Sequence, residues 1–255
     1  MDRFPDRAWD PGRPDIARLL RESAVTDSGL IPSASNYVFV LALAPPGDAD
    51  GDPGPGAAVY KPARGETPLW DFPPDLYRRE VASYVVCEAI GWRLVPPTIV
   101  RDDGLPHGPG SLQAFIPSDR DATYFDLRAD HPDAMRRMAT FDWLTNNADR
   151  KGGHVLRGED GTIWGIDNAL SFHVEDKLRT VIWDYAGEPV PPALLADVEA
   201  FLGRFQPESP LWASLSEYLE AEECEALRAR AGQILESRVF PQPPDWRRPY
   251  PWPLI

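Results

Sequence analysis

Short apolar runs separated by polar turns mark the first half of the chain. Residues 37–44 are almost continuously apolar and predict a buried strand, and the Pro-, Gly- and Asp-rich stretch 44–56 predicts a long turn. Residues 76–90 carry an apolar stripe at helical spacing, and Gly91 directly after them is a common helix stop. Further strands are predicted by the apolar runs 57–60, 92–101 and 111–116. We therefore expect a small antiparallel sheet with one long helix.

Helical periodicity dominates the second half. Residues 132–145 predict a long helix with Met135, Met138, Ala139 and Leu144 on its inward face. Three further amphipathic helices are predicted at 193–203, 211–219 and 224–238. The pattern as a whole predicts an α+β fold of two lobes. Its expected parts are a small lobe at 1–117, a larger and mainly helical lobe at 118–240, and a Pro- and Trp-rich tail at 241–255 that docks on the body or on a partner.

A loop and a hairpin follow the helix at 132–145 and carry the candidate chemistry. The loop includes Asp149, Arg150, Lys151 and His154, and the Asp160-Gly161 turn between two short apolar runs predicts a hairpin that ends at Asp167. Phosphoryl transfer needs one carboxylate near the acceptor hydroxyl and another on the metal that neutralises the developing charge. We therefore expect the hairpin to bring Asp167 beside the loop with Asp149.

These residues carry a family resemblance. Asp149-Arg150, a possible metal ligand at His154, and Ile166-Asp167-Asn168 with Phe172 beyond resemble the phosphatidylinositol 3-/4-kinase-like branch of the protein-kinase-like fold, which includes the HipA-type serine kinases. The residues from about 15 to 205 are similar to an actinobacterial family called SCO1664-like. The segments that fit this family are Val59-Tyr60-Lys61-Pro62, Tyr77-Arg78-Arg79-Glu80 and Asn147-Ala148-Asp149-Arg150-Lys151-Gly152-Gly153-His154.

The resemblance implies a nucleotide site in the small lobe. It implies that Lys61 contacts ATP phosphates and pairs with Glu80, although a surface lysine and an ordinary helix salt bridge would also fit the pattern. By order along the chain, Gln113 and Phe115 fall at the hinge behind the adenine. The polar turn with Ser33, Ser35 and Asn36 is a candidate for phosphate contact, and a plain hairpin explains it equally well.

Composition narrows the possible partners. The formal charge of −14 and the pI near 4.7 disfavour binding to nucleic acid or to anionic lipid. The three lysines are Lys61, Lys151 and Lys177, and two of them lie in the motif segments.

The two cysteines, Cys87 and Cys224, have neither a metal nor a redox spacing and are expected to be reduced thiols. No apolar run is long enough to span a membrane, so we expect a soluble cytoplasmic protein.

The sequence therefore predicts a kinase that uses ATP with Mg²⁺ or Mn²⁺ to phosphorylate a hydroxyl of a protein or small molecule. Asp149, Arg150 and Lys151 are the expected catalytic residues, and His154 and Asp167 the expected metal ligands. His154 stands where most relatives have Asn, and magnesium prefers oxygen ligands. Two alternatives remain at this point: a nucleotide-binding pseudokinase that regulates a partner, and a phosphatidylinositol kinase.

Overall fold

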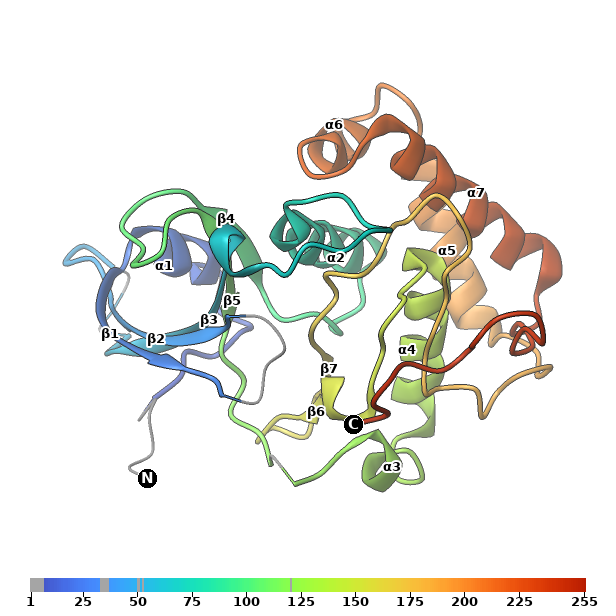
Figure 1. Ribbon diagram of the computed structural model, residues 1–255, viewed down its shortest axis with the longest axis horizontal. Helices are drawn as coiled ribbons and strands as arrows, with labels where there is room; N and C mark the ends of the chain where they lie inside the picture. The colour runs from blue at the N-terminus through green and yellow to red at the C-terminus, as the bar shows by residue number, and fades with distance from the viewer. Residues whose placement is uncertain (1–6, 33–36, 50, 52, 120) are drawn as a thin grey trace. The chain divides into compact units, whose positions relative to one another are not determined.

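The computed structural model describes residues 7–32, 37–49, 51, 53–119 and 121–255. The chain divides into two compact units (Figure 1), the first formed by Met1–Tyr84 and Pro96–Pro117 and the second by Val85–Val95 and Ser118–Ile255. The second unit thus takes in residues 85–95 as well as the C-terminal segment 241–255.

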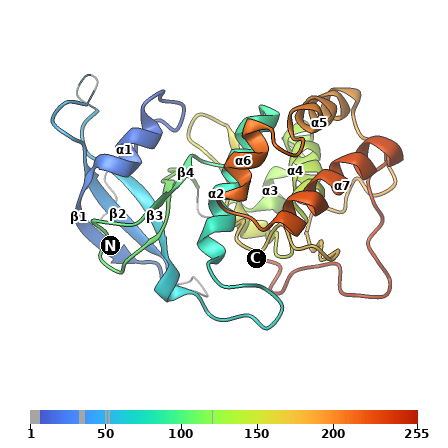
Figure 2. The same cartoon turned by 90° about the horizontal axis from the view of Figure 1, so that it is seen from above.

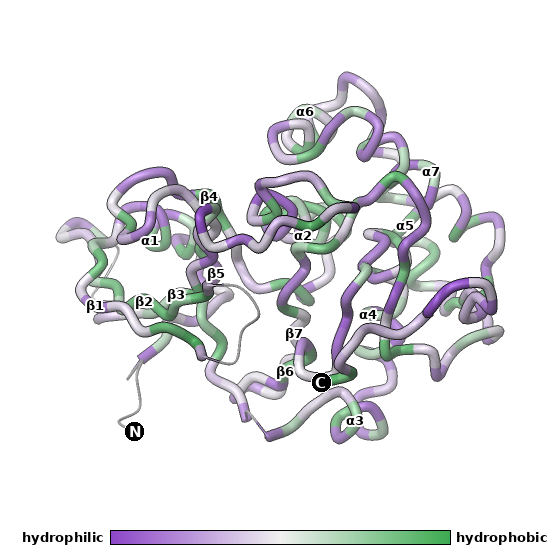
Figure 3. The backbone as a smooth tube through the Cα atoms, in the orientation of Figure 1, coloured by the Kyte–Doolittle hydropathy of each residue, from purple (hydrophilic) through white to green (hydrophobic). Residues whose placement is uncertain are grey.

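The first unit is built on an antiparallel five-stranded sheet. In spatial order its strands are β1 (Ala24–Leu30), β2 (Phe39–Ala44), β3 (Gly56–Pro62), β5 (Gly110–Ala114) and β4 (Thr98–Arg101). The short helices are α1 (Ile16–Glu22) and η1 (Ala63–Gly65), and the long helix α2 (Leu76–Ile90) begins in this unit. Figure 3 shows apolar, green stretches along β2 and β3, as the sequence pattern predicts.

Helix α1 covers one face of this sheet. Ile16, Leu19 and Leu20 of α1 pack with buried apolar side chains of β2, β3, β4 and β5 in one core cluster, and Val25 of β1 packs against it. The side chain of Arg101 on β4 donates hydrogen bonds to the carbonyls of Leu20 and Ser23 and thereby satisfies the end of α1. The sheet and its helix are therefore joined by both apolar burial and capping.

The strand predicted at 92–101 is wrong in its first half, since β4 begins only at Thr98. Gly91 has φ +81° and ends α2, and the following residues turn around the buried Cys87 thiol. The amides of Leu94 and Val95 each donate to Cys87 Sγ at 3.3 Å. Pro96 and Pro97 then lack the amide hydrogens that a longer strand would need.

The second unit is mainly helical. Its elements are α3 (Tyr124–Leu127), α4 (Pro132–Thr145), η2 (Gly152–His154), β6 (Val155–Arg157), β7 (Ile163–Gly165), α5 (Pro192–Arg204), α6 (Pro210–Ser216) and α7 (Ala221–Ser237). Helix α7 packs against α4, α5 and α6, and Figure 2 shows α4, α5 and α7 side by side. The predicted inward residues of α4, namely Met135, Met138, Ala139 and Leu144, are all buried.

The hairpin of β6 and β7 forms as predicted. Its strands pair antiparallel, and Gly161 in the turn has φ +81°, a conformation that glycine adopts without strain. The Asp160 side chain accepts hydrogen bonds from the amide and hydroxyl of Thr162 and fixes the turn. The α+β fold class predicted from the sequence is confirmed. Among the described residues, no helix is both long and apolar enough to span a membrane.

Candidate functional site

A left-handed residue turns the chain out of α4 into the loop at 146–154, here called the Asp149 loop. Asn146 has φ +57°, which ends the helix. Its side-chain amide donates to the carbonyls of His173 and Glu175 at 2.9 and 2.7 Å, and its side-chain oxygen accepts from the Lys177 amide at 2.9 Å. Asn146 therefore fastens the segment at 173–177 to the start of the Asp149 loop.

The backbone around Asp149 is held by hydrogen bonds on both sides. The Asn147 side-chain oxygen accepts from the Asp149 amide at 2.9 Å, and the Ala148 amide donates to the Leu170 carbonyl at 2.7 Å. Further along, the Arg150 amide donates to the Arg179 carbonyl at 3.1 Å. The position of the Asp149 side chain is thus set by the segment that follows the hairpin.

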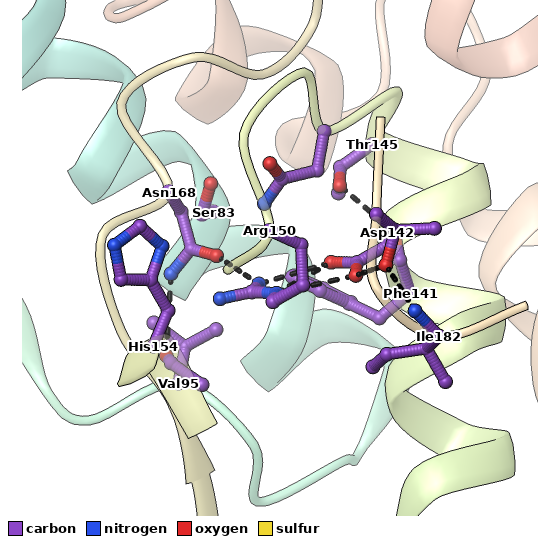
Figure 4. Close-up of polar contacts among 12 residues, drawn as sticks. Ser83, Val95, Phe141, Asp142, Thr145, Arg150, His154, Asn168 and Ile182 are labelled. Carbon is purple, nitrogen blue, oxygen red and sulfur yellow. Dashed lines mark hydrogen bonds and ion pairs between the residues drawn. The ribbon is translucent and has the colours of Figure 1, made fainter. Parts of the chain in front are cut away.

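Arg150 anchors the loop from the interior of the second unit (Figure 4). Its guanidinium is fully buried, like the Asp142 carboxylate of α4, and the two form an ion pair at 2.9 Å. It also donates to the Ile166 carbonyl at 2.7 Å and to the Asn168 side-chain oxygen at 2.5 Å. Burial raises the pKa of Asp142, and the charge of Arg150 opposes that shift. One side chain therefore joins α4, the loop and the end of the hairpin.

The Asp149 carboxylate is partly accessible and electrostatically tuned. Its side chain keeps 25% of its surface exposed and pairs with the Lys151 ammonium at 3.0 Å. Burial raises the pKa of Asp149 above its ordinary value, the charge of Asp167 adds to that shift, and Lys151 and Arg179 oppose it. A carboxylate with a raised pKa is a better proton acceptor than a free one.

The hairpin brings His154 and Asp167 together. The Ile166 amide donates to the His154 carbonyl at 2.9 Å, and the His154 Nε2 lies 3.2 Å from an Asp167 carboxylate oxygen. Asp167 has φ +58°, an uncommon conformation for a residue other than glycine, which turns its side chain off the strand end. The predicted meeting of the loop and the hairpin end is therefore present within one unit.

The side chains of His154 and Asp167 have the donor atoms to supply two of the ligands of a small divalent ion. Among the described residues, no group of three or more His, Cys, Asp or Glu side chains forms a metal site. Magnesium is ordinarily held by one or two protein ligands, with phosphate and water supplying the rest. Neighbouring ligands about 2.1 Å from an octahedral ion lie roughly 3 Å apart, close to the 3.2 Å between the two side chains.

A second ion pair lies in the first unit. The Lys61 ammonium on β3 contacts the Glu80 carboxylate of α2, as the family resemblance implies. Glu80 is buried with 1% of its side chain exposed, whereas Lys61 keeps 20% exposed. The lysine therefore retains access to solvent, and hence to a ligand.

The remaining predicted nucleotide contacts have different surroundings. Gln113 is buried and its side chain donates to the Thr98 hydroxyl at 2.9 Å, while the Phe115 amide donates to the Ala57 carbonyl at 3.2 Å. These donors are used inside the sheet, so a contact of this segment with a base would need other groups. Ser33, Ser35 and Asn36 lie outside the described residues.

A cavity of about 310 Å³ adjoins Asp149 within the second unit. Its lining residues are Ala148, Asp149, Arg179, Arg247, Arg248, Tyr250, Pro251 and Trp252. The arginines at 247 and 248 were not predicted as site residues, because they lie about 100 residues after Asp149 in the chain. The signal available was a pair of arginines between tryptophans in an otherwise acidic chain.

Comparisons with known proteins identify the fold of the chain. No family model matches the chain. In solved structures, it is similar to hydra Fam20 with sugar, at a TM-score of 0.53, 14% identity and 87% coverage of each chain. It is also similar to the proinflammatory kinase CtkA of Helicobacter pylori, at a TM-score of 0.52 and 8% identity, over 87% of this chain and 94% of that one. At these identities the likeness establishes a kinase-like fold.

A sequence relative is closer. Protein Rv2133c of Mycobacterium tuberculosis is 38% identical, and the match covers 95% of this chain and 96% of the relative. The relation to phosphatidylinositol 3-/4-kinases and to HipA-type kinases stays a prediction from the motifs. Since identity at this level extends over nearly the whole of both chains, the protein belongs to the same actinobacterial family as Rv2133c.

Proposed function

We propose that the protein is an ATP-dependent phosphotransferase that acts on a hydroxyl group. The observation that carries this proposal is that Asp167, which contacts His154, also lies near enough to Asp149 for its charge to raise the pKa of Asp149, on a loop and hairpin that Arg150 locks in place. A carboxylate for the acceptor beside a pair of metal-binding groups is the arrangement that phosphoryl transfer requires. The kinase-like fold supports the same reaction class.

Each residue has a separate task in this proposal. Asp149 orients the acceptor hydroxyl and receives its proton, and Lys151 holds the Asp149 carboxylate in place by their ion pair. Arg150 is a positioning residue, because its fully buried guanidinium is engaged by Asp142, the Ile166 carbonyl and Asn168. Lys61, aligned by Glu80, contacts the nucleotide phosphates as a compact positive charge.

Magnesium or manganese is the proposed metal. His154 and Asp167 would hold it, each through one of the two atoms that now face each other. A metal ion held there would supply positive charge to neutralise the charge that develops on the transferred phosphoryl group. An imidazole ligand shifts preference toward manganese, since carboxylate and water oxygens suit magnesium better.

The family assignment and the acceptor are finer parts of the proposal. We assign the chain to the phosphatidylinositol 3-/4-kinase-like branch, related to HipA-type kinases, with Gln113, Phe115, Ser33, Ser35 and Asn36 near the nucleotide. A hydroxyl of a protein or small molecule is the proposed acceptor rather than an inositol lipid. The formal charge of −14 opposes approach to an anionic lipid surface.

A pseudokinase is the second candidate. It is favoured by one observation, the 3.2 Å contact between His154 and Asp167, which engages both proposed metal ligands with each other. A protein that kept this contact would bind nucleotide without transferring phosphate. Transfer of label from ATP to any acceptor would exclude this candidate.

Nucleotide-dependent melting tests the proposal. ATP with Mg²⁺ or Mn²⁺ at 100 times its dissociation constant should stabilise the fold by about 2.7 kcal/mol. Asp167→Asn should reduce the shift, whereas Asp160→Asn, which changes a turn carboxylate of the same hairpin, should keep it. The absence of a shift with any purine nucleotide and either metal would contradict both candidate functions.

A further inference from the structure

We propose that the cavity beside Asp149 binds the phosphoryl acceptor, and that this acceptor is a small hydroxyl compound carrying a phosphate or carboxylate group. This inference rests on the proposed phosphotransferase function and adds the chemical class of its substrate. It follows from the size of the cavity, the charges on its walls and the way the C-terminal segment forms one side of it.

The size of the cavity favours a small molecule. Its volume is about 310 Å³, at the lower end of the roughly 300–1,000 Å³ typical of small-ligand pockets. The side chain of Asp149, the proposed proton acceptor, lies on its wall. A compound of the size of a phosphorylated sugar or polyol would therefore place a hydroxyl near this carboxylate.

The residues that line the cavity carry a net positive charge, although the chain as a whole is acidic. Three arginines, Arg179, Arg247 and Arg248, line the cavity with a single carboxylate, Asp149, while the chain as a whole has a formal charge of −14. A guanidinium offers forked donors that match phosphate and carboxylate oxygens. This local excess of positive charge selects an anion.

Two of these arginines have hydrogen-bond donors that are not engaged by described residues. Arg248 is exposed, and within the described part of the chain its guanidinium has no hydrogen-bond or ion-pair partner and lies over the Trp252 ring at 5.0 Å. Arg247 donates to the Leu178 carbonyl and the Asp176 carboxylate, each at 2.7 Å, but its buried Nε has no partner there. A buried donor without a partner costs free energy unless a ligand satisfies it.

The C-terminal segment is fastened as a wall. The Pro249 carbonyl accepts hydrogen bonds from the Thr180 amide and the Trp183 indole, both at 3.1 Å. The Leu254 carbonyl accepts from the Gly152 amide at 2.7 Å, inside the Asp149 loop. A β-carbon added at Gly152 would come within 2.9 Å of the Phe125 ring and 3.3 Å of that carbonyl, so only glycine permits this approach.

The reaction at this site balances as a simple transfer. The acceptor hydroxyl oxygen forms a bond to the γ-phosphorus of ATP while the bond from that phosphorus to the β,γ-bridging oxygen breaks. Asp149 takes the hydroxyl proton, and ADP leaves with the electron pair of the broken bond. Arg247 and Arg248 act on the anionic group of the acceptor, which takes no part in bond making.

The first test measures anion binding with inorganic phosphate as the probe. The full chain is saturated with a non-hydrolysable ATP analogue and Mg²⁺, and melting is compared in phosphate and in chloride of equal ionic strength. We expect phosphate to raise the melting temperature of the wild type. Arg248→Gln should abolish the rise, while Arg157→Gln, which changes an exposed arginine of β6 outside the cavity, should retain it.

The second test measures transfer from labelled ATP to three separated pools of a cell extract: anionic small molecules, neutral small molecules and proteins. We expect label mainly in the anionic pool, and Arg248→Gln should lower kcat/KM with that acceptor by about tenfold to a hundredfold through KM. The melting shift caused by ATP and metal should be the same in Arg248→Gln and the wild type.

The outcomes separate the two claims. Three results would each overturn the anionic acceptor and leave the phosphotransferase in place. They are label only in neutral compounds or proteins, no phosphate-dependent melting shift, and an Arg248→Gln variant that behaves like the wild type. A wild type that shows neither an ATP-dependent shift nor transfer to any pool would overturn the proposed function, and this inference with it.

Discussion

Two buried carboxylates, one in each unit, are paired with cations in different ways. In the second unit, Arg150 and Asp142 are both fully buried. In the first unit, Glu80 is equally hidden, but its partner Lys61 keeps 20% of its side chain exposed. The same charge chemistry therefore serves a fixed internal anchor in one place and an accessible ligand contact in the other.

The choice of cation follows from this difference. Arg150 uses its planar guanidinium to reach Asp142, Asn168 and the Ile166 carbonyl at once, which a lysine cannot do. Lys61 presents one compact ammonium that can turn between Glu80 and a phosphate. Loss of Arg150 should therefore harm folding most, and loss of Lys61 should harm nucleotide binding most.

The largest expected effect comes from removing the cation of the internal anchor. Arg150→Met leaves Asp142 buried without its cation and should lower the free energy of unfolding by about 3–5 kcal/mol. Urea denaturation measures this loss. The double variant with Asp142→Leu should recover part of it, because the uncompensated carboxylate is then also gone. A loss below that of Lys61→Met would contradict the comparison.

The next effect separates Asp149 from Asp167. Asp149→Asn should lower the rate of transfer by about 10²–10⁴-fold, because the proton acceptor is lost, and should leave ATP binding intact. Asp167→Asn should weaken metal-dependent ATP binding itself. Isothermal titration with ATP and Mg²⁺, together with transfer rates, distinguishes the two. Equal losses of binding would mean that these roles are wrongly assigned.

Lys61→Met tests the accessible ion pair of the first unit. It should weaken ATP binding by about tenfold or more, because a charged hydrogen bond to phosphate is lost. Lys177→Met is the matched control, since it changes the only lysine outside the proposed site and should keep ATP affinity. Similar ATP affinities for the two variants would argue against phosphate contact by Lys61.

Metal preference tests His154. His154→Asn should shift preference from Mn²⁺ toward Mg²⁺, because an amide oxygen replaces the imidazole nitrogen. His154→Ala should weaken metal binding by about tenfold or more. Titration of both metals in the presence of ATP measures this. If the two variants behave alike and metal dependence is unchanged, His154 only packs against Asp167.

The smallest expected effect is in the pH dependence. The pKa of Asp149 in the folded protein lies above its ordinary value of 3.8, and transfer needs its ionised form. Activity should therefore fall as pH drops through this raised pKa, and the stability that protonated Asp149 contributes should be lost as pH rises through it. Lys151→Met removes an interaction that lowers the pKa, so the acidic limb should move upward by about one pH unit or less. A downward move would contradict the assigned ion pair.

Local patterns were sufficient to predict the elements that position the site. The helix at 132–145 and the hairpin around Asp160-Gly161 rest on periodicity and turn chemistry within a few residues, and both are present at nearly the predicted bounds. The strand predicted at 92–101 was wrong in its first half, because a buried thiol and two prolines outweighed an apolar run.

Contacts between distant residues could not be predicted in the same way. In the sequence, Asp142 is one polar position on the predicted helix, and its role depends on contacts with Arg150 and Thr180 in the interior. The arginines at 247 and 248 reach the Asp149 cavity only because the C-terminal segment returns to the loop. The roles of Lys61, Asp149, His154 and Asp167 stay predictions that await measurement.

A comparison of phosphate transfer by two proteins decides whether Asp149 is the proton acceptor of a phosphotransferase. Wild type and Asp149→Asn are saturated with labelled ATP and metal, with equal nucleotide occupancy verified by titration, and label in the pooled acceptors of a cell extract is followed in time. The account predicts transfer by the wild type and a loss of at least about a hundredfold in the variant. Equal transfer by both proteins, or none by the wild type at full occupancy, would contradict it.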